Sequence, residues 1–327
     1  MVLITLRAIE WTFRLQPMKR VTVSLDNKET SQQKDISAEG PVNLKKVAVD
    51  ALDLTLNLRG VGWDWSRGRF PPFNRSTESR PAFLFDTVLS LIVKLSVTDI
   101  LQYTIQAMSP STFGSIAGGT IFDPSLPPLL RYSRSSLISL LGGAVIYFSL
   151  EAQQELLACI GVIIFRQHPT QWPPLFYKPW RSTSLAEFWG KRWHQAFKPS
   201  FIAVAGNPLS VLFGRAGQVL GVFLMSGLLH DISLWGMGRG TEFWSVGGFF
   251  LMMAVGVILE DIWKSSGRKV NGVVGWVWTM GWTIGWANML VDAWYKRGVA
   301  GCTHFTGSQR PVMFIARYIF GRELQSL

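Results

Sequence analysis

The sequence is poor in charge and in cysteine. Charged residues make up 16% of its 327 positions, against roughly 25% in soluble globular chains. Hydrophobic residues reach 48%, which argues against the disordered and fibrous classes. Two cysteines, Cys159 and Cys302, form no disulfide framework. The four histidines contain no close ligand pair of the kind that a zinc site uses, so we expect no bound metal.

Acidic residues are also scarce relative to basic ones, 21 against 32, which gives a formal charge of +11. Such a balance is typical of attraction to anionic lipid heads, of basic cytoplasmic loops, or of a phosphate-bearing ligand. The basic residues are scattered between apolar segments, without a basic stripe, a zinc-finger spacing or an RNA-binding signature. Nucleic acid is therefore not expected as a partner.

Long apolar segments are abundant in the second part of the chain, and the 15 tryptophans suit the two interfaces of a bilayer. A transmembrane helix needs about 20 mostly apolar residues. Five segments fit this length, at 81–107, 136–165, 209–230, 243–263 and 273–295. The sequence predicts an all-α, polytopic transmembrane bundle of about five spans over 81–327, preceded by an N-terminal segment and polar loop at 1–80.

Several of these segments contain ionisable residues. Asp86, Lys94 and Asp99 lie in the first, and Glu151 and Glu155 lie near the middle of the second. An ionisable group at bilayer depth costs about 2.5 to 3.5 kcal/mol even on a lenient insertion scale, so such groups normally face a bundle interior or a wet cavity. We therefore expect the bundle to surround something polar.

Loop charges predict an orientation for an integral, multi-pass membrane protein, which we expect in the endoplasmic reticulum. The loops at 166–200 and 264–269 are basic, whereas 231–242 has a single basic residue, Arg239. By the positive-inside rule the first two are cytoplasmic and the third is lumenal. The glycosylation sequon Asn74-Arg75-Ser76 then falls on the cytoplasmic side.

The region around His194 predicts an amphipathic helix. Ser184 and Glu187 have the spacing of a capping box, which predicts a helix beginning there. Two opposite faces then follow: Leu185, Trp189, Trp193 and Ala196 on one, and Glu187, Lys191, His194 and Lys198 on the other. Such a helix lies in the membrane interface, either as a plain anchor or as an anchor that presents a polar edge to a pocket.

His230 stands at the end of an apolar run and is followed by Asp231. Ser226 lies four residues earlier on the same helix face. The histidine either pins two helices through a satisfied hydrogen bond or has a catalytic role, and its position alone does not separate these readings. The sequence contains no nucleophile elbow, P-loop or dinucleotide fingerprint, so those enzyme classes are not indicated.

Three motifs occur in order along the chain: Trp172-Pro-Pro-Leu-Phe176, Ser184 to Gln195 with both of its Trp residues, and Phe223 to His230. Together they resemble the wax synthase-like branch of the membrane-bound O-acyltransferases. The segment Arg59-Gly-Val-Gly-Trp63 is similar to fungal members of that branch, which include secondary-metabolite O-acetyltransferases. The resemblance covers most of residues 55 to 300.

The resemblance implies roles for both histidines. His230 matches the family's intramembrane catalytic histidine, the proposed general base, and His194 matches the Asn or His position that completes the active site. Members of this type transfer an acyl group from a CoA thioester directly to a hydroxyl. In this sequence Asp231 stands where relatives often have Glu, and the N-terminal part looks short for the family.

From this match we predict that His230 takes the proton of the acceptor while His194 donates a hydrogen bond to the thioester oxygen or orients the donor. The predicted substrate-binding residues are Trp189, Lys191, Arg192, Trp193, Gln195 and Ser226. The two basic residues among them are expected to meet the phosphates of CoA. The two tryptophans are expected to line the tunnel or stack with adenine, with packing against lipid as the alternative for at least one.

The sequence thus predicts an acetyl-CoA-dependent O-acetyltransferase. Its acceptor is expected to be a hydroxylated apolar secondary metabolite of the terpenoid or meroterpenoid kind. Acetyl-CoA is the co-substrate, membrane lipids are the surroundings, and no cofactor is expected. Two alternatives stay open: a long-chain wax-ester or sterol-ester synthase, and a transporter or scaffold in which the buried ionisable residues line a passage and the histidines are structural.

Overall fold

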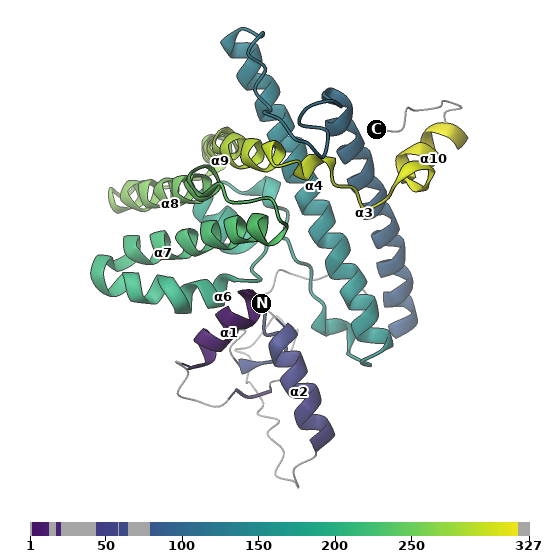
Figure 1. Cartoon of the computed structure of the whole chain (residues 1–327). Coiled ribbons are helices and arrows are strands. Elements are labelled where there is room, and N and C mark those ends of the chain that lie inside the picture. Colours follow the sequence, from purple (N-terminus) through teal and green to yellow (C-terminus); the bar gives the residue numbers. More distant parts are fainter. Residues whose placement is uncertain (1, 13–17, 21–43, 58, 65–78, 320–327) are drawn as a thin grey trace.

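The computed structural model describes residues 2–12, 18–20, 44–57, 59–64 and 79–319 (Figure 1). Within these ranges the regular secondary structure is helical, apart from one isolated β-bridge between Arg20 and Trp63. The prediction of an all-α fold is confirmed. The sequon at 74–76 lies outside the described residues.

The α-helices differ widely in length, and several of them are short. They are α1 Val2–Thr12, α2 Leu44–Leu56, α3 Arg80–Met108, α4 Pro128–Ile163, α5 Leu185–Glu187, α6 Lys198–Phe201, α7 Asn207–Gly236, α8 Phe243–Ser265, α9 Gly272–Lys296 and α10 Pro311–Tyr318. Two π-helical turns, η4 Phe188–Arg192 and η5 Ile202–Gly206, continue α5 and α6. Short 3₁₀ turns lie at Pro169–Gln171, Pro179–Arg181, Val299–Gly301 and Gly307–Gln309.

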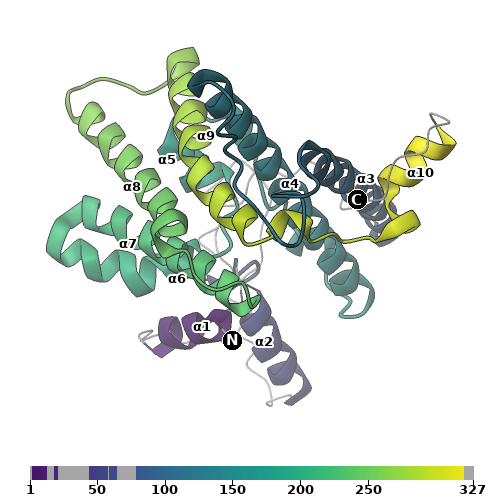
Figure 2. The same ribbon diagram turned by 45° about the horizontal axis from the view of Figure 1, so that its top comes forward.

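Each long helix packs against the next one in a row, and the helices do not surround one common axis. Helices α3 and α4 lie side by side, α4 packs on α9, α9 on α8, and α8 on α7 (Figures 1 and 2). Helix α10 returns to α3, and α1 contacts α6. The segment between α4 and α6 contacts α4 through Phe176 and Tyr147, α7 through Trp189 and Phe223, and α8 through α5.

Three described helical segments are long and apolar enough to cross a membrane: Pro128–Ile163, Lys198–Gly236 and Phe243–Ser265. Helices α3 and α9 occupy the other two predicted positions, with 29 and 25 residues. Helix α3 contains several charged residues, and α9 is rich in Trp and Gly.

The segment Lys198–Gly236 folds back on itself. Phe213 and Gly214 have non-helical backbone angles, and Gly214 has φ +57°, a conformation that glycine adopts without strain. A Cβ at Gly221 would lie 2.6 Å from the carbonyl oxygen of Ala205, so the two arms pack closely. The predicted single span beginning at residue 209 is therefore wrong at its start, because the second arm begins after this turn.

The ionisable residues of the predicted spans are mostly paired between helices. Lys94 Nζ lies 2.7 Å from both Glu151 Oε2 and Glu155 Oε1, which joins α3 to α4. Asp99 accepts a 2.8 Å hydrogen bond from Arg310 Nε. These contacts agree with the expectation that such groups face the interior of the bundle. Asp86 differs, because its side chain is exposed.

Candidate active site

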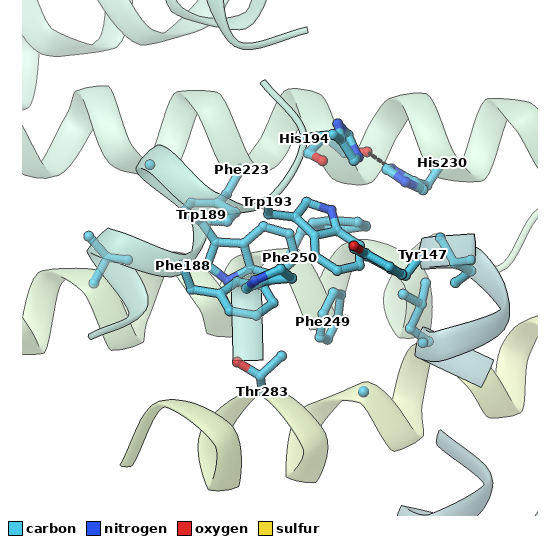
Figure 3. Close-up of a pocket in the computed structure, with 18 of the residues that line it drawn as sticks. Tyr147, Phe188, Trp189, Trp193, His194, Phe223, His230, Phe249, Phe250 and Thr283 are labelled. Carbon is cyan, nitrogen blue, oxygen red and sulfur yellow. Dashed lines mark hydrogen bonds between the residues drawn. The ribbon is translucent and has the colours of Figure 1, made fainter. Parts of the chain in front are cut away.

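A cavity of about 570 Å³ lies between α4, α7, α8 and α9 and is also lined by the segment 186–202. Its wall is mainly aromatic and aliphatic (Figure 3). Helix α7 contributes one stripe of side chains at steps of three and four residues, which share a helix face. The stripe consists of Arg215, Gln218, Val219, Val222, Phe223, Ser226 and His230.

His230 is held by its own helix. Its Nδ1 atom lies 2.7 Å from the carbonyl oxygen of Ser226, the contact drawn as a dashed line in Figure 3. A carbonyl oxygen only accepts, so Nδ1 carries a proton and the neutral ring has its lone pair on Nε2. Phe250 packs against the ring at 4.5 Å between centroids, and Trp294 stacks on it at 6.1 Å. The imidazole is thereby fixed in tautomer and in orientation.

The helix predicted from Ser184 does begin there. Ser184 Oγ accepts the backbone N–H of Glu187 at 3.0 Å, as an N-cap residue does. The helix is short, however, because α5 passes into η4 and Trp193 already has an extended backbone. Phe188 and Trp193 stack at 5.4 Å across this wide turn. The prediction of a long amphipathic helix carrying His194 is wrong, since aromatic packing ends the helix before that residue.

His194 instead follows the helix and points into the cavity. Its ring contacts those of Phe176, Trp193 and Phe197, with centroid distances of 5.7, 5.8 and 6.2 Å. Burial, with a smaller contribution from His230, lowers the pKa of His194 to about 4. The side chain is therefore neutral near pH 7.

The structure brings the two histidines together. Both line the same cavity although they are far apart in the sequence (Figure 3). The effect of His230 on the pKa of His194 is a further sign of proximity. Of two neutral imidazoles in an apolar wall, one can accept a proton and the other can donate a hydrogen bond. Such a pair can perform acid–base chemistry on a polar group of an otherwise apolar ligand.

Of the predicted substrate-binding residues, Trp189, Trp193 and Ser226 line the cavity. Trp189 packs edge-on against Phe223 and Phe249, so it forms part of the wall rather than a lipid-facing anchor. Ser226 contributes its backbone carbonyl to His230.

The other three predicted substrate-binding residues are not part of the cavity lining. Lys191 is exposed. Arg192 donates from Nε to Glu187 at 2.8 Å, and Gln195 donates to the carbonyl oxygen of Trp189 at 3.0 Å. Arg192 and Gln195 thus shape the segment that carries Trp193 and His194, whereas direct contact with substrate remains a prediction for them.

Sequence reasoning missed several residues of the wall. Lys198 and Arg215 bring charge to the lining, and Tyr147 and Thr283 bring hydroxyl groups. Arg215 could have been found, because it lies on the helix face that leads to His230. Tyr147 and Thr283 carry no comparable local signal, since only helix packing turns them inward.

A buried carboxylate anchors the start of α5. Glu260, 2% exposed, accepts the backbone N–H groups of Leu185 at 2.6 Å and Ala186 at 3.0 Å. Trp278 Nε1 donates to the same carboxylate at 3.0 Å. Glu260 thereby satisfies N–H groups that a helix start leaves without intrahelical partners. Among the described residues, no three His, Cys, Asp or Glu side chains gather closely enough to hold a metal ion.

Comparison with known proteins finds relatives that match this part of the chain. The model of the membrane bound O-acyl transferase family matches residues 172–252, which contain both histidines. The acetyltransferase ataH of Aspergillus terreus is 29% identical over 70% of this chain and 83% of its own length. The acetyltransferase atnC of Arthrinium sp is 27% identical over 77% of this chain and 64% of its own length. The acyl-CoA–sterol O-acyltransferase 1 of Arabidopsis thaliana is 32% identical over 39% of this chain and 37% of its own length.

The cavity and these matches define a membrane enzyme of the acyltransferase class. The model of this family matches the central part of the chain, and the similarity to fungal acetyltransferases extends over most of the chain's length. The family resemblance seen in the sequence motifs is confirmed.

Proposed function

We propose that the protein transfers an acetyl group from acetyl-CoA to a hydroxyl of an apolar acceptor, of the terpenoid or meroterpenoid kind. The observation that carries this proposal is the pairing of His194 and His230 in one largely apolar cavity of about 570 Å³. An apolar wall suits an apolar acceptor, and the histidines supply the polar groups that the transfer needs.

In the proposed reaction, Nε2 of His230 accepts the hydroxyl proton while the hydroxyl oxygen attacks the thioester carbon. The carbon–sulfur bond then breaks, and the CoA thiolate takes the proton from His230. His194 donates a hydrogen bond to the carbonyl oxygen as negative charge develops there. Alignment of donor and acceptor can supply about 7 to 11 kcal/mol, and a positioned base adds about 10² to 10⁴ in rate.

We place the phosphates of CoA at the Arg215 end of the α7 stripe. Arg215 is an exposed cation of the lining and contacts Asp261 at 3.3 Å. Asp261 lies next to the basic loop at 264–269, which the charge rule predicts to be cytoplasmic. The helix rise puts Arg215 roughly 22 Å from His230, a distance that an extended thioester arm has to bridge.

The acetyl donor is supported by the names of the fungal relatives, and the sterol-ester alternative by the name of the plant acyl-CoA–sterol O-acyltransferase. We further propose that α3 and α9 cross the membrane together with the three more apolar segments, which gives about five spans over 81–327. The proposed location is the endoplasmic reticulum.

The test is to incubate purified protein in lipid nanodiscs with labelled acetyl-CoA, labelled palmitoyl-CoA and a panel of terpenoid and sterol alcohols. We expect label from acetyl-CoA in an ester of a terpenoid alcohol. Ester from palmitoyl-CoA alone would favour the wax-ester or sterol-ester alternative. Consumption of neither donor would contradict the proposed transferase activity and favour a transport or scaffold role.

A further inference from the structure

We infer that Arg59 and Glu151 are positioning residues for His194, because they hold the segment Pro173–Phe176 from two sides and Phe176 packs against the histidine ring. This inference rests on the proposed function and adds to it a part of the chain that precedes the long helices. Neither residue lines the cavity.

Arg59 holds one side of the segment. Its Nη1 donates to the carbonyl oxygen of Pro174 at 2.7 Å, and its Nη2 donates to that of Pro173 at 2.6 Å. The two successive carbonyls match the planar fork of a guanidinium, which presents parallel donors in a fixed geometry. Because prolines restrict the backbone here, the guanidinium binds two carbonyl groups whose positions are rigidly held.

Glu151 holds the other side from the middle of α4. Its Oε1 accepts the backbone N–H of Phe176 at 3.1 Å, and its Oε2 receives Lys94 Nζ at 2.7 Å. Lys94 also binds Glu155, which in turn accepts the hydroxyl of Ser90 at 2.8 Å. The carboxylate is therefore fixed on two helices before it meets the segment. Charges of both signs meet in this cluster, which offsets the cost of burying them.

Phe176 links the position of the segment Pro173–Phe176 to the position of the His194 ring. Its side chain is 4% exposed and lies among the rings of Tyr147, Trp193 and His194, at centroid distances of 4.7, 4.7 and 5.7 Å. The planes of Phe176 and His194 are 82° apart, an edge-to-face arrangement that depends on ring position. A shift of the backbone at residue 176 would therefore move the wall against which His194 rests.

The test uses the full chain and the variants Arg59→Gln, Arg59→Lys and Glu151→Gln. We expect kcat to fall by about 10², because a misplacement of about 1 Å at a reacting centre has that effect. The KM for acetyl-CoA should change by less than about threefold, since neither residue lies in the cavity. Arg59→Lys should resemble Arg59→Gln, because one ammonium cannot reproduce the fork.

A double-mutant cycle separates positioning from a general structural role. If Arg59 acts through His194, the double variant Arg59→Gln with His194→Gln should be no slower than His194→Gln alone. Losses that multiply would overturn the inference. The matched control is Arg310→Gln, which breaks the buried pair with Asp99 in a part of the fold outside the cavity lining. It should lower the melting temperature and leave kcat of the folded protein unchanged.

A second measurement does not depend on turnover. In protein with labelled histidine, the NMR chemical shift of the His194 ring should change in Arg59→Gln and in Glu151→Gln. It should stay unchanged in Arg310→Gln. An unmoved signal would overturn the positioning role even in an active enzyme. A shifted signal in a protein that uses no acyl-CoA would keep the inference and reject the proposed function.

Discussion

Nδ1 of His230 lies 2.7 Å from the carbonyl oxygen of Ser226, one helical turn earlier in α7. The group that we propose as base and the group that orients it therefore belong to the same helix, and the orienting atom is part of the backbone. This arrangement fixes the tautomer through a backbone carbonyl and leaves Nε2 as the acceptor for a proton.

Replacing His230 by Ala removes the proposed base, so we expect kcat to fall by about 10² to 10⁴. The measurement is the initial rate with labelled acetyl-CoA, together with the melting temperature of the protein in nanodiscs. His304, which is exposed, provides the control variant His304→Ala. Retained activity in the His230 variant of a folded protein would remove it from the base role.

The pKa of His194 predicts a pH effect on stability. Folded His194 has a pKa of about 4, against a reference of 6.5. Above pH 6.5 both forms of the chain keep this side chain neutral. As the pH falls from 6.5 toward 4, the unfolded chain binds a proton that the folded chain does not. The folded state should therefore lose about 2 kcal/mol from this group between pH 7 and pH 5.

The check compares thermal unfolding of wild type and His194→Gln at pH 7 and pH 5. The variant cannot titrate at this position, so the difference between its melting temperatures at pH 7 and pH 5 should be smaller than in wild type. Equal differences in the two proteins would show that folding does not lower the pKa of His194.

Local rules explain what could be predicted from the sequence. The apolar segments and the cap at Ser184 follow from periodicity, from hydrogen-bond chemistry and from the cost of polar groups at membrane depth. The roles of His194 and His230 were predicted from the family resemblance, because position alone left a structural role open. The turn at Gly214 was not expected, because the surrounding residues read as one apolar segment and only the packing of two arms shows the reversal.

Contacts between distant residues explain what could not be predicted. The helix after Ser184 ends before His194 because Phe188, Trp193 and Phe176 pack together, and helix propensity does not report such packing. Arg59 reaches Pro174 across a separation of 115 residues, so its motif was visible in the sequence but its target was not.

Arg215 offers a test of where CoA enters. Changing Arg215 to Gln should raise the KM for acetyl-CoA about tenfold with little change in kcat, because a charge-assisted contact to phosphate is lost far from the reacting atoms. Added salt should weaken donor binding more in wild type than in the variant. Arg317→Gln, at an exposed position on α10, is the control. A larger increase in KM from Lys191→Gln would instead favour the residues suggested by the sequence.

Gly143 offers a way to narrow the cavity without disturbing the bundle. It lines the wall from α4, and a Cβ there meets no heavy atom of the described residues within 4 Å. Gly143→Leu should therefore fold normally and lower kcat/KM for a polycyclic alcohol by about tenfold or more, since overfilling a packed space costs about 1 to 3 kcal/mol. A short linear alcohol should be affected less. Gly281→Leu is the matched control, because Gly281 lies on α9, is exposed, and likewise has open space at its Cβ. Equal losses for both alcohols would mean that the acceptor does not pass this part of the wall.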